Sequence, residues 1–242
     1  MTGSEQVALV AGGTGAIGGA VIELLVEQGW TVVATHRTGS PHRLDGVRWV
    51  KFDGALNTDT THLRAELTGV PGLLRAVVCT IGAASSKRSI VATDPSEFGA
   101  VFDGNVTSVV RLWQAVHERA RAGKAGVVLL GSDTTTTLSP CNGAYSAAKA
   151  ALEAFAATLA AEEAQHRLRA NVLSPSLIES PLAEHILELK GVTRPSEYYA
   201  GLPWGRALRP HEVAAVAYDV VTNAHWDYMS GQTIRLASRS GR

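Results

Sequence analysis

The chain has 242 residues, and its 22 lysines and arginines balance its 22 aspartates and glutamates, so its formal net charge is zero. This balance, without a basic run, argues against nucleic-acid binding, which needs clustered lysines and arginines. No run of about 18 apolar residues is present, so we expect no transmembrane helix and no membrane partner. The two cysteines, Cys79 and Cys141, are expected to be reduced thiols, which favours a cytoplasmic location.

Short apolar runs alternate with helical patterns along most of the chain. The patterns predict strands at 7–11, 30–35, 47–52, 75–80, 126–130, 168–173 and 232–236. They predict helices at 16–28, 57–69, 144–165 and 210–223, with two helical stretches within 95–123, the second at 105–121. This alternation is typical of an α/β fold with a doubly wound parallel sheet, and we expect a single Rossmann-like domain over residues 1–242.

The segment 174–209 shows the least regular pattern in the chain. It follows the predicted strand at 168–173, and open α/β sheets bind ligands beyond the carboxyl ends of their strands. We therefore expect residues 177–209 to form a substrate loop. Its residues 177–204, together with the segments 83–93 and 133–144, should shape a partly apolar pocket that includes Leu138, Leu177, Leu182, Ile186, Tyr198 and Trp204.

Three glycines, Gly12, Gly15 and Gly18, lie between the first predicted strand and the first predicted helix. Glycines at such a junction allow a tight turn and close approach of a pyrophosphate, which the N–H groups at the helix N-terminus can bind. The alternative is a turn with only a structural role. The strand–loop–helix context favours dinucleotide binding.

The end of the second strand, about 20 residues further on, usually distinguishes NAD from NADP. A carboxylate there would bind the ribose hydroxyl and repel a 2′-phosphate, but this sequence has Arg37 and Thr38. A guanidinium can pair with the phosphate and stack on adenine. We therefore predict NADP(H) in preference to NAD(H), the alternative being a solvated arginine at a strand end.

Tyr145 and Lys149 are four residues apart in a helical pattern, so they share one helix face. Ser132 ends a predicted strand 13 residues earlier, and its hydroxyl could reach the same space. A nearby ammonium favours the phenolate of a tyrosine, so this trio suits proton transfer at a carbonyl or alcohol oxygen. The alternative is a tyrosine–lysine pair on a helix surface.

Taken together, these motifs resemble the short-chain dehydrogenases/reductases over nearly the whole chain. The resemblance is carried by the glycine loop, Asp53, Asn105, Ser132, Tyr145–Lys149, Asn171–Pro175 and Gly231–Thr233. It implies the strand order 3-2-1-4-5-6-7. It also implies a catalytic tetrad, in which Tyr145 is the general acid/base and Ser132 holds the substrate oxygen. Lys149 would bind the nicotinamide ribose and lower the pKa of Tyr145, and Asn105 would hold a water that links Lys149 to solvent.

The resemblance also implies the residues that contact the cofactor. These are Gly12, Thr14, Gly15, Ile17, Gly18, Arg37, Thr38, Asp53, Gly54, Thr80, Ile81, Gly82, Tyr145, Lys149, Pro175, Ile178 and Ser180. The sequence departs from the family pattern at one of these sites and beside several others. Ala11 and Ala16 replace a threonine and a glycine of the loop, Thr80 replaces an asparagine, and Ser176 replaces the glycine after Pro175.

We therefore predict an NADPH-dependent carbonyl reductase, or an alcohol dehydrogenase in the reverse direction, whose partner is a small carbonyl or alcohol compound. A 3-oxoacyl thioester or polyketide-type ketone fits among other substrates. By resemblance, the helices at about 105–121 and 144–165 could pair in a homodimer or homotetramer. The eight histidines show no metal-ligand spacing, so no metal is expected. The alternatives are a non-catalytic NADP(H)-binding sensor or scaffold, and a lyase or epimerase that uses nicotinamide transiently.

Overall fold

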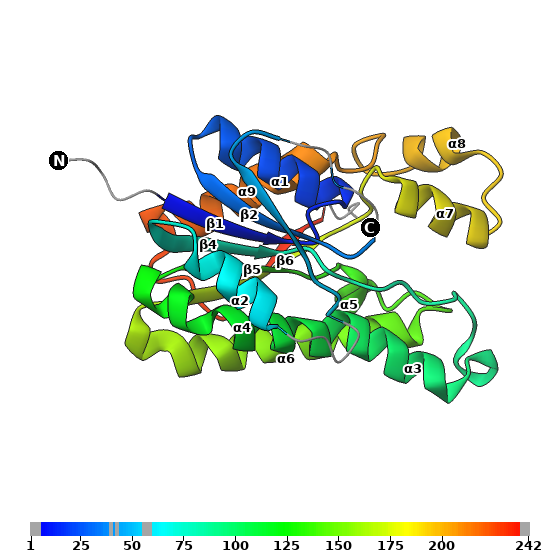
Figure 1. Ribbon diagram of the computed structural model, residues 1–242. Coiled ribbons are helices and arrows are strands. Elements are labelled where there is room, and N and C mark those ends of the chain that lie inside the picture. The colour runs from blue at the N-terminus through cyan, green and yellow to red at the C-terminus, as the bar shows by residue number, and fades with distance from the viewer. Residues whose placement is uncertain (1–5, 39–40, 42–43, 55–59, 238–242) are drawn as a thin grey trace.

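A computed structural model describes residues 6–38, 41, 44–54 and 60–237 of the protein (Figure 1). Within these residues, seven parallel strands form one sheet in the order β3-β2-β1-β4-β5-β6-β7, which confirms the predicted fold and strand order. The strands are β1 (Gln6–Ala11), β2 (Thr31–His36), β3 (Val47–Lys51), β4 (Leu73–Cys79), β5 (Gly126–Leu130), β6 (Arg169–Pro175) and β7 (Thr233–Leu236).

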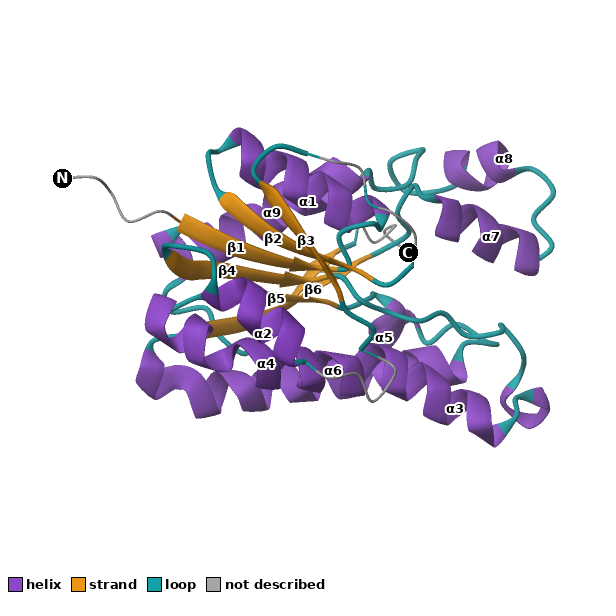
Figure 2. Cartoon of the chain, in the orientation of Figure 1, coloured by secondary structure: helices purple, strands orange, loops and turns teal. Residues whose placement is uncertain are grey.

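Helices cover both faces of the sheet (Figure 2). They are α1 (Ala16–Glu27), α2 (Thr61–Thr68), α3 (Pro95–Phe102), α4 (Ser108–Gly123), α5 (Thr134–Thr137), α6 (Gly143–Glu163), α7 (Pro181–Leu189), α8 (Pro195–Ala200) and α9 (Pro210–Thr222). In Figure 1, α1 and α9 lie above the sheet, whereas α2, α4 and α6 lie below it. No helix in the described part of the chain is long and apolar enough to span a membrane.

The central strand β1 shows why this sequence forms a sheet with two covered faces. Successive side chains of a strand point to opposite faces. Val7 and Leu9 accordingly join the core that α4 and α6 cover. Ala8 and Val10 join the core that α1 and α9 cover. A strand that is buried on both faces needs a continuous apolar run, which is the pattern at 7–11.

The strand order reverses direction between β1 and β4. Ligands of open α/β sheets bind at such a reversal, beyond the carboxyl ends of the strands. The glycine loop follows β1 and the Thr80–Gly82 stretch follows β4, so the fold brings these two segments together. Thr80 joins them, since its hydroxyl donates to the carbonyl oxygens of Ala11 at 3.0 Å and Gly12 at 3.1 Å.

Two segments differ from the predicted elements. The helical stretches within 95–123 are joined by a π turn at Asp103–Thr107, so Asn105 lies in a widened turn rather than at a helix start. The segment 174–209 is more regular than predicted, because it contains α7 and α8. Pro181 and Pro195 begin these helices, a position at which proline lacks only an N–H that would have no helical partner.

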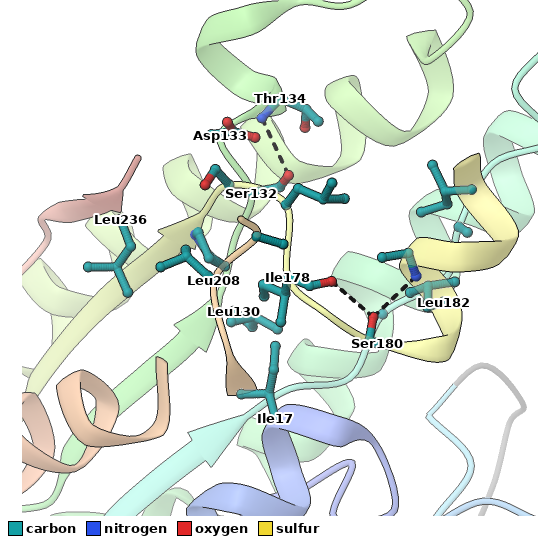
Figure 3. Close-up of a pocket in the computed structure, with 18 of the residues that line it drawn as sticks. Ile17, Leu130, Ser132, Asp133, Thr134, Ile178, Ser180, Leu182, Leu208 and Leu236 are labelled. Carbon is teal, nitrogen blue, oxygen red and sulfur yellow. Dashed lines mark hydrogen bonds between the residues drawn. The ribbon is translucent and has the colours of Figure 1, made fainter. Parts of the chain in front are cut away.

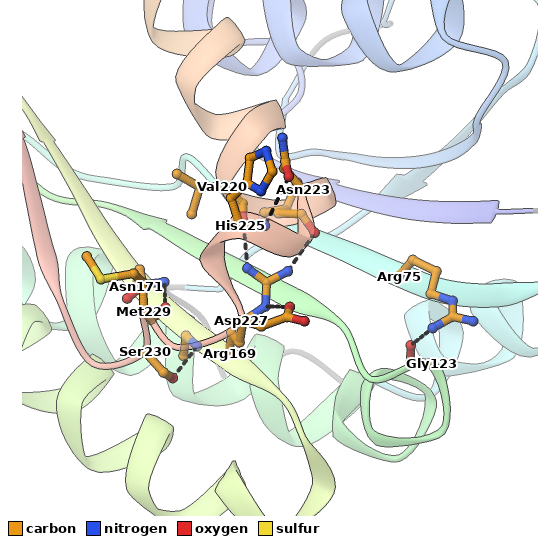
Figure 4. A network of polar contacts seen from close by, with 12 residues as sticks. Arg75, Gly123, Arg169, Asn171, Val220, Asn223, His225, Asp227, Met229 and Ser230 are labelled. Atoms are coloured by element: carbon orange, nitrogen blue, oxygen red, sulfur yellow. Dashed lines mark hydrogen bonds and ion pairs between the residues drawn. The ribbon is translucent and has the colours of Figure 1, made fainter.

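Polar side chains hold loops at the amino ends of the strands, opposite the end of the sheet that carries the glycine loop (Figure 4). The Arg169 guanidinium donates to the carbonyl oxygens of Val220 at 2.8 Å and Val221 at 3.4 Å and pairs with Asp227 at 3.5 Å. Asn171 donates to the carbonyl oxygen of Met229 at 2.7 Å and accepts from the backbone N–H of Gln232 at 2.9 Å. Asn171, part of a stretch that carries the family resemblance, therefore holds the loop that leads into β7.

Replacing Asn171 with alanine should lower the free energy of unfolding by about 1–3 kcal/mol, because the two hydrogen bonds of this fully buried side chain are lost. Urea titration followed by circular dichroism measures this loss. The control is Gln165→Ala, which removes an exposed amide and should change the free energy by less than about 0.5 kcal/mol. Equal stability of the two variants would mean that Asn171 does not hold this loop.

Candidate active site

A cavity of about 1190 Å³ opens at the carboxyl edge of the sheet (Figure 3). A site for a single small molecule usually measures about 300–1,000 Å³, so this cavity has room for two ligands side by side. Its wall runs from the glycine loop to the substrate loop. Among the predicted site residues, it includes Thr14, Gly15, Ile17, Gly18, Thr80, Gly82, Ser132, Tyr145, Lys149, Pro175, Ile178 and Ser180.

The glycine loop has the backbone geometry that a phosphate group requires. A Cβ atom at Gly18 would lie 2.2 Å from the carbonyl oxygen of Gly12, so only glycine lets the helix approach the turn this closely. Gly12 has φ +86°, a conformation that other residues rarely adopt. No described side chain caps the N-terminus of α1, which leaves its first N–H groups available to an anion. These residues therefore fit the pyrophosphate of a dinucleotide.

Ser132, Tyr145 and Lys149 meet on the wall of the same cavity. Ser132 follows β5, and its Oγ accepts from the backbone N–H of Thr134 at 3.3 Å. Tyr145 and Lys149 lie one turn apart on α6, and the Lys149 Nζ atom is 5.6 Å from the centre of the Tyr145 ring. The Lys149 Nζ atom also donates to the carbonyl oxygen of Leu130 at 2.7 Å, which fixes the ammonium at the end of β5.

The expected lowering of the Tyr145 pKa is wrong for the protein in this structure. Burial raises the pKa of the phenol to about 12, and a hydrogen bond with Ser132 only partly opposes that rise. Burial also lowers the pKa of Lys149 to about 8. Burial, which disfavours the charged form of each group, is the largest cause of both shifts. At neutral pH, Tyr145 is a neutral phenol that can donate a proton.

The buried amine of Lys149 gives stability a distinct pH dependence. Its pKa is about 8 in the folded chain against 10.5 ordinarily, so above pH 8 the unfolded state binds more protons and stability rises with pH. Burial raises the pKa of Cys79 from 9.0 to about 11, which has the opposite effect above pH 9. The Tyr145 pKa acts in the same sense as Cys79 above pH 10. Between pH 8 and 9 the Cys79 and Tyr145 shifts contribute little. Comparison with a Lys149 variant removes the contribution of Lys87, whose pKa is also lowered by burial.

Between pH 8 and 9, the free energy of unfolding of the wild type should rise by about 1 kcal/mol relative to that of Lys149→Met. Urea titrations of both proteins at the two pH values provide the comparison. Lys51→Met, which removes an exposed lysine, should show no such difference from the wild type. A constant difference between wild type and Lys149→Met would show that the amine titrates normally.

Asn105 lies beside this trio rather than on the cavity wall. Its Nδ2 donates to the carbonyl oxygens of Ala83 and Val101, both at 2.8 Å, while its buried Oδ1 has no partner among the described residues. A Cβ atom at Gly82 would lie 3.0 Å from that Oδ1 and 3.4 Å from the Lys149 Nζ atom. Asn105 Oδ1 and Lys149 Nζ thus both lie close to Gly82. A water there could bridge the two atoms, because a buried polar atom without a protein partner usually binds a water.

The wall opposite α6 comes from the segment that follows β6. Pro175 and Ile178 line it, and Ile178 pairs with Leu208 through a backbone bridge that closes the base of the substrate loop. Ser180 lines the cavity and also caps α7, since its Oγ accepts from the backbone N–H of Ala183 at 3.1 Å (Figure 3). Ser180 therefore has a structural partner in addition to its predicted place beside the cofactor.

Other predicted cofactor residues lie outside the cavity wall. Arg37 and Thr38 follow β2, and Asp53 and Gly54 follow β3, at the same edge of the sheet as the glycine loop. A Cβ atom at Gly54 would lie 2.5 Å from the Cβ of Ser108, so contact with α4 explains why this position lacks a larger side chain. Ile81, also predicted to contact the cofactor, packs against the core below the sheet.

The predicted pocket residues line the cavity with one exception. Leu138 is absent from the wall.

Five charged side chains on the wall were not singled out from the sequence: Lys87, Asp133, Lys190, Arg206 and Glu212. All except Glu212 lie in segments that were expected to shape the pocket or to form the substrate loop, but no spacing rule connects residues so far apart in the chain. Among the described residues, no three His, Cys, Asp or Glu side chains are clustered as a metal site requires.

Comparison with known proteins supports the same family. A family model described as "Enoyl-(Acyl carrier protein) reductase" matches residues 12–237. The 3-oxoacyl-[acyl-carrier-protein] reductase FabG of Vibrio cholerae is 27% identical over 238 residues, which cover 96% of this chain and 95% of FabG. A tropinone reductase homologue of Arabidopsis thaliana is 28% identical over 256 residues, which cover 97% of this chain and 94% of the homologue.

Among solved structures, a short chain dehydrogenase family protein from Francisella tularensis superposes with a TM-score of 0.84. The two chains are 22% identical, and the match covers 96% of this chain and 97% of the other. At this identity the likeness concerns the fold, whereas the family model matches nearly the whole sequence. The chain belongs to the short-chain dehydrogenase/reductase family of oxidoreductases.

Proposed function

We propose that the protein is an NADP(H)-dependent oxidoreductase that interconverts a ketone and an alcohol, chiefly as a carbonyl reductase. The observation that carries this proposal is the meeting of Ser132, Tyr145 and Lys149 in a cavity that also reaches the glycine loop. The glycine loop would hold the pyrophosphate, Arg37 the 2′-phosphate, and Lys149 the nicotinamide ribose. Asp53, Thr80 and Gly82 would contact the adenosine, and Pro175, Ile178 and Ser180 the nicotinamide.

The bound nicotinamide would supply the hydride that the carbonyl carbon receives. Ser132 would donate a hydrogen bond to the carbonyl oxygen and hold it beside the Tyr145 hydroxyl. Because burial raises the pKa of Tyr145 to about 12, the phenol carries the proton that this oxygen needs. After this transfer, the Tyr145 phenolate would be reprotonated through Lys149 and a water held at Asn105 Oδ1. A protonated phenol suits carbonyl reduction at neutral pH, whereas alcohol oxidation needs the phenolate and hence a higher pH.

The substrate loop favours a medium-sized, partly apolar ketone, because Leu177, Leu182, Ile186, Tyr198 and Trp204 line the cavity. Relatives named as 3-oxoacyl-[acyl-carrier-protein] and tropinone reductases support a ketone as the substrate class. We further propose a cytoplasmic homodimer or homotetramer, with α4 and α6 at the subunit contact. Size-exclusion chromatography with light scattering would measure the assembly.

A ketone screen tests the proposed function. The protein is supplied with NADPH or NADH and a panel of ketones, and loss of reduced-cofactor absorbance is recorded. We expect turnover with NADPH and slower turnover with NADH. Tight NADPH binding without turnover of any ketone would indicate a sensor or scaffold. Substrate conversion without net loss of NADPH would indicate a lyase or epimerase.

A further inference from the structure

A positively charged subsite lies next to Tyr145. The Lys87 Nζ atom sits over the Tyr145 ring, 5.4 Å from its centre, and both residues line the cavity. Lys190, at the end of α7, lines the same cavity. Figure 1 shows α7 above the segment that joins β4 to α3, which carries Lys87. The two lysines therefore belong to different segments of the cavity wall.

Neither lysine forms an ion pair within the described part of the chain, because no carboxylate there lies within ion-pair distance of either. Two carboxylates do belong to the cavity wall. Glu212 is already paired with Arg206 at 2.6 Å, which leaves Asp133 as the counter-charge of this region. Leaving Lys149 aside, two ammonium groups face one carboxylate, so this end of the cavity carries a net positive charge.

The position of Lys87 is fixed by the structure around it. Its Nζ atom donates to Asn142 Oδ1 at 2.5 Å, and the hydroxyl of Ser85 donates to the same oxygen at 3.1 Å. Asn142 is buried at the start of α6, three residues before Tyr145. An ammonium has three N–H groups, and Asn142 takes one, so two remain for a ligand. Lys87 also has φ 61°, an uncommon backbone conformation for a residue other than glycine.

We propose that Lys87, assisted by Lys190, binds an anionic group of the substrate and selects carbonyl compounds that carry a carboxylate or similar anion near the reacting carbonyl. This inference rests on the proposed function, since it concerns the substrate of the same site. The phosphates of a dinucleotide would lie at the glycine loop, so they do not account for a lysine beside Tyr145. The negative charge of Asp133 disfavours an anion, but the two positive charges of Lys87 and Lys190 exceed it.

The test uses three isomeric acids, 2-oxo-, 3-oxo- and 4-oxopentanoate, each paired with its methyl ester. The ester keeps the carbonyl and removes the charge, so each pair isolates the anionic group. The wild type should reduce at least one acid with a KM tenfold or more below that of its ester. Lys87→Met should raise the KM for that acid about 30-fold, because a charge-assisted hydrogen bond is lost, and should change the ester's KM less than threefold.

Three further variants sharpen the test. Lys87→Arg should restore most of the discrimination, and Asp133→Asn should lower the KM for the acid. Arg88→Met makes the same charge change at the adjacent exposed position, which is not part of the cavity wall, and should leave both KM values unchanged. Changes in KM without a matching loss of kcat would distinguish an anion-binding residue from one that only supports the fold.

Calorimetry separates this inference from the proposed reaction. Wild-type protein saturated with NADP⁺ cannot reduce a ketone, so binding of each acid and ester can be measured directly. Acid binding that Lys87→Met weakens at least tenfold supports the subsite even if no ketone is turned over. If the esters are reduced as well as the acids and Lys87→Met changes neither, the anion subsite is wrong while the reductase stands. Failure of every acid to bind would also overturn the subsite.

Discussion

Replacing Tyr145 with phenylalanine should lower kcat for ketone reduction about a thousandfold or more, while the Kd for NADPH changes less than threefold. General acid catalysis by a placed side chain contributes about 10²–10⁴ to a rate, and no other described hydroxyl has both the Ser132 contact and the neighbouring Lys149 ammonium. The substitution removes one oxygen atom and keeps the ring that Lys87 and Lys149 approach.

Steady-state kinetics measures the loss of kcat, and fluorescence titration of bound NADPH measures the Kd. Tyr228→Phe is the matched control, because Tyr228 is fully exposed and does not belong to the cavity wall. It should retain the wild-type kcat. A Tyr145→Phe protein that keeps more than a tenth of the wild-type kcat would contradict the assignment of this phenol as the proton donor.

Most of the fold could be predicted because its determinants are local. The apolar run at 7–11 specifies a strand buried on both faces, and the two resulting cores contain its alternate residues. The glycine spacing of the first loop and the four-residue spacing of Tyr145 and Lys149 likewise follow from short-range geometry. The approach of Ser132 to these two residues depends on the whole sheet. Ser132 follows β5, and the register of β5 with β4 and β6 decides where that strand ends.

Features that depend on tertiary packing could not be predicted. The π turn at Asp103–Thr107 has no sequence signal, although it turns Asn105 toward Gly82. Lys87 and Lys190 are more than a hundred residues apart, so only the folded chain shows that they share a cavity. The direction of the Tyr145 pKa shift also depends on burial, which the sequence does not measure and which here is the largest cause of the shift.

Replacing Arg37 with aspartate should lower the ratio of kcat/KM for NADPH to kcat/KM for NADH about a hundredfold. Arg37 is exposed at the end of β2, two residues after Thr35, whose backbone and side-chain oxygens accept from the N–H groups of Gly13 at 2.9 Å and Gly12 at 3.1 Å. Thr35 thus holds the end of β2 against the glycine loop, and Arg37 follows two residues later. An aspartate there would lose charge-assisted bonds to the 2′-phosphate, repel it, and accept hydrogen bonds from the ribose hydroxyls of NAD(H).

The control for this substitution is Arg48→Asp, which makes the same charge change at an exposed position near the amino end of β3, away from the carboxyl edge that holds the glycine loop. Long-range electrostatics alone would shift the cofactor ratio similarly in both variants, whereas direct contact with the 2′-phosphate requires a large shift only at Arg37. Kinetics with both cofactors at low and moderate salt separates these cases. A ratio that stays within threefold of the wild type in Arg37→Asp would show that a different group binds the 2′-phosphate, and the preference for NADP(H) would then need another basis.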